Sequence, residues 1–92
     1  MSVFYVYILE VISKKGKKSY YTGYTKNLYR RWEEHRTGKG AKYCRGKHIE
    51  LKYYETFSNR KRAMKRELEI KSFPKEEKKR LCTNAISNSQ NS

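Results

Sequence analysis

Residues 3–11, Val-Phe-Tyr-Val-Tyr-Ile-Leu-Glu-Val, limit the possible folds of this chain more than any other segment. The segment is rich in β-branched and aromatic residues and is too short and continuous for an amphipathic helix, so it predicts a strand covered on both faces. Side chains alternate along a strand, which leaves one face purely apolar and gives the other two phenolic hydroxyls. The apolar face holds Phe4, Val6 and Ile8, and the other holds Tyr5, Tyr7 and Leu9. We therefore expect the central strand of a small sheet.

A lysine-rich turn and a second extended segment follow this strand. Residues 13–18, Ser-Lys-Lys-Gly-Lys-Lys, place a glycine within a loop, and residues 19–22 resume the aromatic pattern of a strand. The two segments predict a β-hairpin in which Tyr7 and Tyr21 are near neighbours. Gly23 comes next, and it allows a close approach of the backbone that a side chain would block.

Residues 28–36 predict a helix, because Thr25 and Asn27 ahead of them are both good N-cap residues. On a wheel of about 100° per residue, an i, i+3, i+4, i+7 stripe forms the inward face of this helix. The stripe consists of Leu28, Arg31, Trp32 and His35. Arg31 and His35 are therefore expected to point toward the sheet.

The rest of the chain predicts a loop, a strand and two helices. Residues 37–47 contain three glycines and four basic residues, a composition typical of a mobile cationic loop, and such a loop could clamp phosphates. Residues 49–57 return to strand alternation. Asn59 caps a helix that runs to about Phe73, and Pro74 stops it and opens another.

The last helix is expected to end near Thr83, because residues 84–92 are uncharged and polar and have little surface to bury. We therefore predict a single domain at residues 1–83, followed by a disordered polar tail. A chain of 92 residues is long enough for one hydrophobic core and too short for two.

Glu67 is the carboxylate that most needs explanation in the helix after Asn59. With Ala63 taken as zero, Ile70 falls at about −20° and Glu67 at about 40°, inside the apolar arc. A carboxylate in a buried stripe is unfavourable unless it is paired, hydrogen-bonded or bound to a cation. Glu67 therefore predicts a partner, whereas Glu69 on the opposite side requires none.

The net charge of +14 indicates a polyanionic partner, and nucleic acid is the first to consider. The excess of 23 basic over 9 acidic residues is spread along the whole predicted domain, and aromatic residues make up 14% of the chain, which argues against a disordered polycation. No apolar run is long enough to span a membrane and no secretory signal is evident, so we expect a cytoplasmic protein. Cys44 and Cys82 form no Cys-x-x-Cys pair and are read as ordinary thiols.

The polar residues expected to face inward have the ingredients of phosphodiester cleavage. A carboxylate can hold one Mg²⁺ or Mn²⁺ ion, an arginine can grip the non-bridging phosphate oxygens, and a tyrosine or histidine can take a proton from water. The candidate catalytic residues are Tyr7, Tyr21, Arg31, His35 and Glu67, with Glu67 as the metal ligand. The candidate nucleic-acid contacts are Lys26, Arg30, Lys39, Lys42, Arg45 and Lys47. These cations are expected to touch phosphates without reading sequence.

The order of these motifs resembles the GIY-YIG nuclease superfamily, and most closely its small stand-alone bacterial members. The shared features are the tripeptides Tyr5-Val6-Tyr7 and Tyr21-Thr22-Gly23, then the helix arginine and histidine, then the glutamate of the later helix. The resemblance covers residues 3 to about 80. It implies an α+β, sandwich-like fold in the order ββαβαα, with both tripeptides on adjacent strands of a three-stranded mixed or antiparallel sheet flanked by helices.

The sequence departs from the family pattern at three places. Tyr5 stands where the family name has Gly, and Thr22 stands where it has Ile. Many members also place an Asn after the last core helix, where this chain reads Lys-Ser-Phe-Pro at residues 71–74. The first two positions shape backbone or packing and carry no chemistry, whereas the third bears on the support of the site.

The function expected from these features is a metal-dependent endonuclease acting on DNA. Since the chain has no room for a separate sequence-reading domain, selectivity is expected to follow the structure of the DNA or a partner. Two other functions remain open: a noncatalytic nucleic-acid-binding module with the same fold, and an adaptor for a protein partner. The module predicts salt-dependent binding without metal dependence, and the adaptor predicts binding that salt does not change.

The candidate residues also have ordinary structural interpretations. Tyr7 and Tyr21 suit cross-strand aromatic packing. His35 suits an interior histidine or a cap at the end of its helix. Glu67 and Arg31 suit a buried ion pair with each other. The structure can separate these interpretations, because each predicts a different contact.

Overall fold

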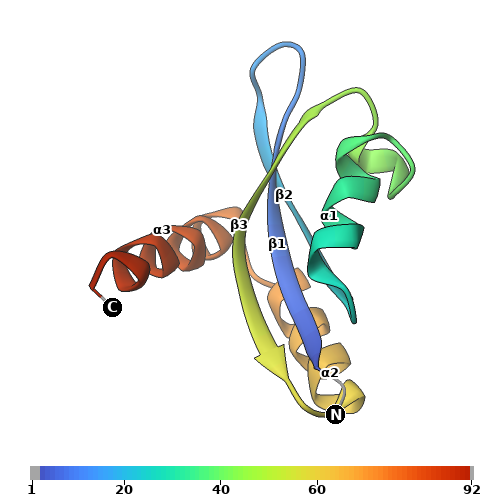
Figure 1. The fold of residues 1–92 in the computed structure, drawn as a ribbon. Helices are drawn as coiled ribbons and strands as arrows, with labels where there is room; N and C mark the ends of the chain where they lie inside the picture. The colour runs from blue at the N-terminus through green and yellow to red at the C-terminus, as the bar shows by residue number, and fades with distance from the viewer. Residues whose placement is uncertain (1–2, 92) are drawn as a thin grey trace.

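A computed structural model of the chain describes residues 3–91, with side chains described as far as Asn84. Strands and helices follow one another in the predicted order ββαβαα (Figure 1). They are β1 (Phe4–Ile12), β2 (Lys18–Thr25), α1 (Leu28–Arg36), the 3₁₀ turn η1 (Lys42–Cys44), β3 (His48–Phe57), α2 (Arg60–Lys71) and α3 (Lys75–Asn91). This order, together with the sheet, confirms the α+β fold expected from the sequence.

The sheet is antiparallel, and its strand order is β2-β1-β3, so that β1 is central as predicted. Tyr7 lies opposite Gly23 of β2 on one side and Tyr54 of β3 on the other. Tyr21 lies opposite Leu9. Because Tyr7 and Leu9 share a face, Tyr7 and Tyr21 are diagonal neighbours on that face, close enough for aromatic side chains to share a contact.

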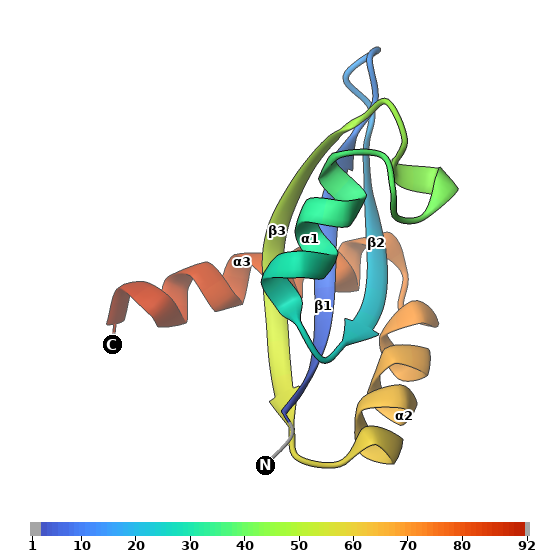
Figure 2. The ribbon, with the colours of Figure 1, turned by 45° about the vertical axis from the view of Figure 1, so that its right-hand side comes forward.

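The helices cover the two faces of the sheet separately. α1 and the segment after it lie over one face, where a cluster that includes Tyr7, Leu9 and Ile49 is buried (Figure 2). α2 and α3 pack on the other face, where Val6 and Ile8 are buried among residues of both helices (Figure 1). The alternation predicted for β1 is therefore confirmed. It places the candidate tyrosines on the side of α1.

The helix starts follow the predicted caps. The side chains of Asn27 and Asn59 each accept a hydrogen bond from a backbone N–H in the first turn of α1 and α2. The predicted end of the last helix near Thr83 is wrong, because α3 continues to Asn91. No glycine or proline follows Pro74 to stop it. The domain division after residue 83 stays a prediction. Within residues 3–91, none of the helices combines the length and the apolar character that a membrane span needs.

Candidate active site

His35, in the last turn of α1, lies at the centre of the candidate site and is fully buried. Its Nδ1 accepts a hydrogen bond of 3.2 Å from the backbone N–H of Ala41, and its Nε2 is 2.9 Å from the hydroxyl oxygen of Tyr7. A backbone N–H can only donate, so Nδ1 must be unprotonated and the ring proton must be on Nε2. His35 therefore donates to Tyr7. Both ring nitrogens are occupied by protein groups.

The environment of His35 also keeps it uncharged. Burial lowers the pKa of His35 below its ordinary value, and the nearby Arg31 guanidinium lowers this pKa further, against a smaller opposite effect of Glu34. A neutral imidazole is the form that the two hydrogen bonds require. The structure therefore supports the interior-histidine interpretation and adds a specific task, which is to hold the hydroxyl of Tyr7.

The lowered pKa of His35 predicts a loss of stability in mild acid. The unfolded chain binds the proton more readily than the folded one. The contribution of neutral His35 to the free energy of unfolding is therefore complete above about pH 6.5 and decreases as the pH falls below that value. This single group can contribute at most about 1.4 kcal/mol per pH unit. Urea unfolding at several pH values between about 8 and 5.5 measures the slope. His35→Gln should flatten it and His48→Gln, at an exposed position, should not; equal slopes for all three proteins would contradict the assignment.

Tyr7 is the residue on which the other predicted residues converge. Its side chain is only 2% exposed. Burial raises the pKa of Tyr7 to about 12, and Arg31 opposes this rise while Tyr21 and Glu67 add to it. Three further candidates, from β2, α1 and α2, therefore lie near enough to act on its hydroxyl, in addition to the hydrogen-bonded His35.

Tyr21 differs from Tyr7 in its surroundings. It is half-buried, and its ring packs against His35 with 5.0 Å between the ring centroids. It also stacks on Tyr43 of η1, at 6.4 Å between centroids. Among residues 3–84, no side chain or backbone group forms a hydrogen bond with its hydroxyl. The Tyr21 hydroxyl thus keeps its hydrogen-bonding capacity for water or a ligand, whereas the Tyr7 hydroxyl is engaged.

Two glycines make room for this arrangement. A Cβ atom at Gly23 would lie 2.4 Å from the Tyr7 hydroxyl oxygen and 2.7 Å from Cζ. A Cβ atom at Gly40 would lie 2.4 Å from Nδ1 of His35 and 2.9 Å from its Cα. The close approach expected at Gly23 is therefore present, and the chain makes a second one at Gly40 that the sequence analysis did not identify.

Gly23→Ala is expected to lower the free energy of unfolding by about 1–3 kcal/mol, because Tyr7 must leave its position. Chemical denaturation measures this loss. The atom nearest to the new methyl group is the Tyr7 hydroxyl oxygen, so the double variant Gly23→Ala/Tyr7→Phe should lose less stability than the sum of the single variants. Additive losses would show that the two side chains do not compete for the same space.

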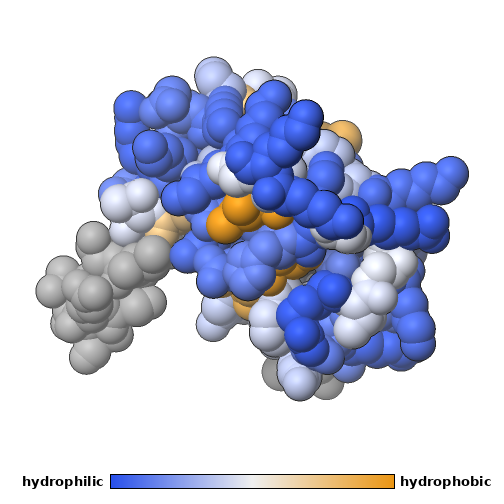
Figure 3. Space-filling model, turned by 90° about the horizontal axis from the view of Figure 1, so that it is seen from above, coloured by the Kyte–Doolittle hydropathy of each residue, from blue (hydrophilic) through white to orange (hydrophobic). Residues whose placement is uncertain are grey.

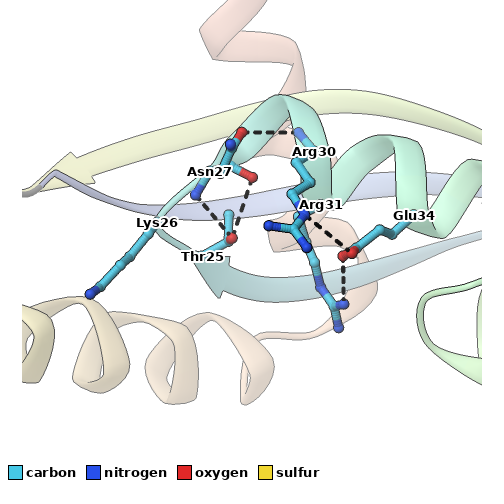
Figure 4. Close-up of a pocket in the computed structure, with 6 residues that line it drawn as sticks. All are labelled: Thr25, Lys26, Asn27, Arg30, Arg31 and Glu34. Atoms are coloured by element: carbon cyan, nitrogen blue, oxygen red, sulfur yellow. Dashed lines mark hydrogen bonds and ion pairs between the residues drawn. The ribbon is translucent and has the colours of Figure 1, made fainter.

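Arg31 lies at the edge of an open groove of about 390 Å³ at the start of α1 (Figure 4). The groove is lined by Thr25, Lys26, Asn27, Arg30, Arg31 and Glu34. Arg30 and Arg31 both converge on Glu34, and one guanidinium nitrogen of Arg31 lies 3.1 Å from its carboxylate (Figure 4). The Arg31 side chain remains 37% exposed, so part of its guanidinium is free to bind an anion.

Glu67 belongs to α2, on the other face of the sheet, and is linked to the candidate site by its effect on the pKa of Tyr7. Its side chain is only 15% exposed, and its one ion-pair partner among the described side chains is Lys71, at 3.6 Å. The ion pair with Arg31 that the sequence left open is absent there, because Arg31 pairs with Glu34. A long, weak pair with a flexible lysine leaves the carboxylate available to a cation. The prediction that Glu67 needs a partner is met only weakly by the protein itself.

The residues around Glu67 fit a hard divalent cation held by few protein ligands. Within residues 3–84, no group of three or more His, Cys, Asp or Glu side chains could hold a metal ion. Mg²⁺ commonly binds one or two carboxylates and completes its shell with water and substrate phosphate oxygens. A single weakly paired carboxylate suits that mode, and the described residues form no closed cage of protein ligands.

The segment between α1 and β3 is held by several hydrogen bonds and one cation–π contact. The backbone N–H groups of Lys39 and Gly40 both donate to the Glu34 carbonyl, and Arg45 donates to the Gly38 carbonyl. Lys47 lies over the ring of Tyr43, with its amine 4.1 Å from the centroid. The predicted loop is therefore present and contains a 3₁₀ turn, whereas its mobility stays a prediction. Three of the four predicted cations here are exposed: Lys39, Lys42 and Arg45.

Comparison with known proteins identifies the family. The family model of the GIY-YIG catalytic domain matches residues 3–80. The chain belongs to the GIY-YIG family. The matched span contains all three strands, α1 and α2, and every one of the five candidate catalytic residues. The resemblance seen in the two tripeptides is therefore confirmed at the level of the family.

Relatives of this GIY-YIG domain are found in several organisms. A UPF0213 protein of Haloquadratum walsbyi is 46% identical over 79 residues, which cover 85% of this chain and 84% of the relative. A UPF0213 protein of Oceanobacillus iheyensis is 47% identical over 78 residues, covering 84% and 86%. The solution structure of a UPF0213 protein of Bacillus halodurans, 39% identical, matches 88% of this chain and 83% of its own with a TM-score of 0.50. The names of these relatives state no activity.

Proposed function

We propose that this GIY-YIG domain is a metal-dependent endonuclease that hydrolyses phosphodiester bonds in DNA. The observation that carries the proposal is the buried hydrogen bond between Tyr7 and His35, with the ring of Tyr21 packed on His35 and with Arg31 and Glu67 near enough to alter the pKa of Tyr7. The weakly paired Glu67 carboxylate is the group that packing alone explains least, because a largely buried carboxylate is unfavourable without a close partner. The candidate residues together suit the hydrolysis of a phosphodiester, which needs a group that accepts a proton from water and a group that stabilises negative charge.

The two tyrosines take different roles in this proposal. A group that removes a proton from water must be reached by water, and the half-buried Tyr21 with its unengaged hydroxyl meets this condition. Tyr7 does not, because it is buried and its pKa is raised to about 12. Tyr21 is therefore the general base. Tyr7, held by His35, positions the groups around it.

Arg31 and Glu67 act on the phosphate in this proposal. The exposed part of the Arg31 guanidinium binds the non-bridging oxygens and stabilises the negative charge that grows on them as water attacks. Glu67, once Lys71 turns away, would hold a Mg²⁺ or Mn²⁺ ion, which supplies Lewis-acid polarisation of the phosphate and charge stabilisation at the leaving oxygen. The surrounding cations Lys26, Arg30, Lys39, Lys42, Arg45 and Lys47 contact neighbouring phosphates.

A cleavage assay tests the proposal. Purified protein is incubated with supercoiled, linear, single-stranded and branched DNA and with RNA, in Mg²⁺, Mn²⁺ or EDTA. We expect metal-dependent cutting of at least one DNA form, with a preference for DNA structure over sequence. The absence of cutting in every combination would overturn the nuclease proposal.

A noncatalytic nucleic-acid-binding module is the second candidate. The observation that favours it is the Lys71–Glu67 pair, which neutralises the carboxylate without a metal ion. In that case the logarithm of the affinity would fall linearly with the logarithm of the salt concentration. The DNA would stay uncut in both Mg²⁺ and EDTA. Binding and cutting in the same reactions therefore separate the two candidates.

A further inference from the structure

The β1–β2 hairpin projects past the helices at one end of the molecule (Figures 1 and 2). Four lysines lie at its tip: Lys14, Lys15, Lys17 and Lys18. All four are exposed, and within residues 3–84 none of them has an ion-pair partner. Seen from the end to which the hairpin points, the surface is mainly hydrophilic, with a small hydrophobic area between the hydrophilic parts (Figure 3). This hairpin tip is a concentrated positive charge that the protein does not neutralise.

The hairpin tip has a defined conformation. Ser13 donates its N–H to the Lys17 carbonyl at 3.0 Å, and Gly16 donates to the Ser13 carbonyl at 2.8 Å. The Ser13 hydroxyl oxygen accepts a further hydrogen bond of 3.1 Å from the N–H of Lys17. Gly16 adopts a φ of 84°, which favours glycine. The lysines are therefore displayed on an ordered two-stranded ribbon, so that little conformational entropy of the backbone is lost on binding.

The base of the hairpin is tied to the body of the protein. Lys75, in the first turn of α3, donates through Nζ to the Lys18 carbonyl at 2.6 Å. The hairpin tip leads directly into β2, the strand that carries Tyr21. Lys17 and Lys15 come four and six residues before Tyr21, which corresponds to roughly 13–20 Å at about 3.3 Å per residue. A ligand that reaches both the candidate site and the hairpin tip must extend over that distance.

Several other cations of the chain are paired with carboxylates of the protein. Arg31 pairs with Glu34, Arg36 with Glu33, and Arg66 with Glu55. The hairpin, by contrast, has Glu10 as its one acidic residue, and Glu10 is buried in β1 well below the tip. Four like charges on a short turn repel one another, and a polyanion removes this repulsion. A second copy of this chain, also highly positive, does not.

We propose that the hairpin enters the major groove of a B-form DNA duplex next to the scissile phosphate, with its lysines on the phosphates that border the groove. The inference rests on the proposed function, because the distance is counted from the candidate site. The major groove is about 12 Å wide and admits a two-stranded β-ribbon, whereas the minor groove, at about 6 Å, does not. At about 3.4 Å per base pair, the hairpin lies roughly four to six base pairs from the cut.

The same geometry selects against an RNA duplex. The major groove of A-form RNA is deep and narrow and does not accept such a ribbon. The hairpin tip also has no Arg, Asn or Gln to read base edges, and its lysines, which can bind guanine edges as well, are placed on phosphates in this proposal. The hairpin therefore selects duplex DNA by shape and charge and adds no preference for a sequence.

A salt titration of DNA binding tests the inference. The probe is a 20-base-pair DNA duplex, and binding is measured in EDTA so that no cutting occurs. Lys14→Gln/Lys15→Gln/Lys17→Gln should reduce the slope of log affinity against log salt by about 2.7, or about 0.9 for each lost phosphate contact. Between about 50 and 200 mM salt, the wild type should lose roughly 40-fold more affinity than this variant.

The matched control removes the same charge elsewhere. Arg62→Gln/Lys65→Gln/Lys79→Gln has the same net charge, and its exposed positions lie on α2 and α3, away from the hairpin tip. The salt slope of this control should differ from that of the wild type by less than about 0.9, the value for one phosphate contact. Equal slopes for the hairpin variant and the wild type would overturn the inference, and so would equal effects of the hairpin variant and the control.

An RNA duplex of the same sequence provides the second readout. The wild type should prefer DNA over RNA, and the hairpin variant should lose most of that preference while the control keeps it. If the ratio of DNA affinity to RNA affinity were the same in the hairpin variant and the wild type, groove entry would be excluded. Because all measurements are made without metal, a protein that binds through the hairpin but never cuts would overturn the nuclease proposal and the stated distance from the cut, and would leave groove entry by the hairpin standing.

Discussion

Glu67→Gln is expected to abolish metal-dependent cleavage of DNA, by about 10³-fold or more, while leaving DNA affinity in EDTA nearly unchanged. The amide keeps the size and shape of the side chain and removes its charge. Within residues 3–84, no group of three or more acidic, histidine or cysteine side chains offers the ion a separate site. Single-turnover cleavage across a range of Mn²⁺ concentrations measures the effect.

The control for this prediction is Glu69→Gln, which removes a carboxylate from the same helix. Glu69 is exposed and pairs with Arg66 on the side of α2 away from the candidate site, so its loss should leave cleavage within about twofold, as for a surface ion pair. Loss of the Lys71 pair by Glu67→Gln should likewise affect folding little, by about 0.3–0.5 kcal/mol. If Glu67→Gln cut as fast as the wild type, Glu67 would not be the metal ligand.

The sequence predicted the architecture well where local patterns and burial agree. Alternation in β1 assigned Tyr7 and Ile8 to opposite faces, and the structure places them in opposite cores. Asn27 and Asn59 predicted the starts of α1 and α2, because the side chain that caps a helix is close in sequence to the N–H that it accepts from. The end of α3 could not be predicted in this way, because polar residues without glycine or proline neither stop a helix nor require one.

The candidate site was predictable to the extent that helical periodicity determines it. The wheel placed Arg31 and His35 on the inward face of α1, and both act on Tyr7. The support of His35 was not predictable, since it depends on Gly40 and on the backbone N–H of Ala41, which approach the ring through the path of the segment after α1. A backbone N–H leaves no signature in the sequence. The protonation of His35, and with it the difference between the two tyrosines, therefore required the structure.

Tyr21→Phe is expected to slow the chemical step by about 10²–10⁴-fold without changing DNA affinity, because it removes the proposed base and keeps the aromatic ring. The ring contacts with His35 and Tyr43 do not involve the hydroxyl, so the free energy of unfolding should hardly change. Single-turnover rates, binding in EDTA and urea unfolding measure the three quantities. A variant that binds and folds normally but does not cut is the expected result.

Tyr7→Phe is the matched comparison, since it removes one hydroxyl from the same face of the sheet and should show the reverse pattern in folding. Without the Tyr7 oxygen, the buried Nε2–H of His35 has no acceptor, and leaving such a donor unpaired reduces the free energy of unfolding by about 1–3 kcal/mol. Its cleavage should fall less than that of Tyr21→Phe, because a positioning hydroxyl is lost and the base remains. If Tyr7→Phe were the slower enzyme and Tyr21→Phe the less stable protein, the two roles would have to be exchanged, and the buried phenol would be the base despite its raised pKa.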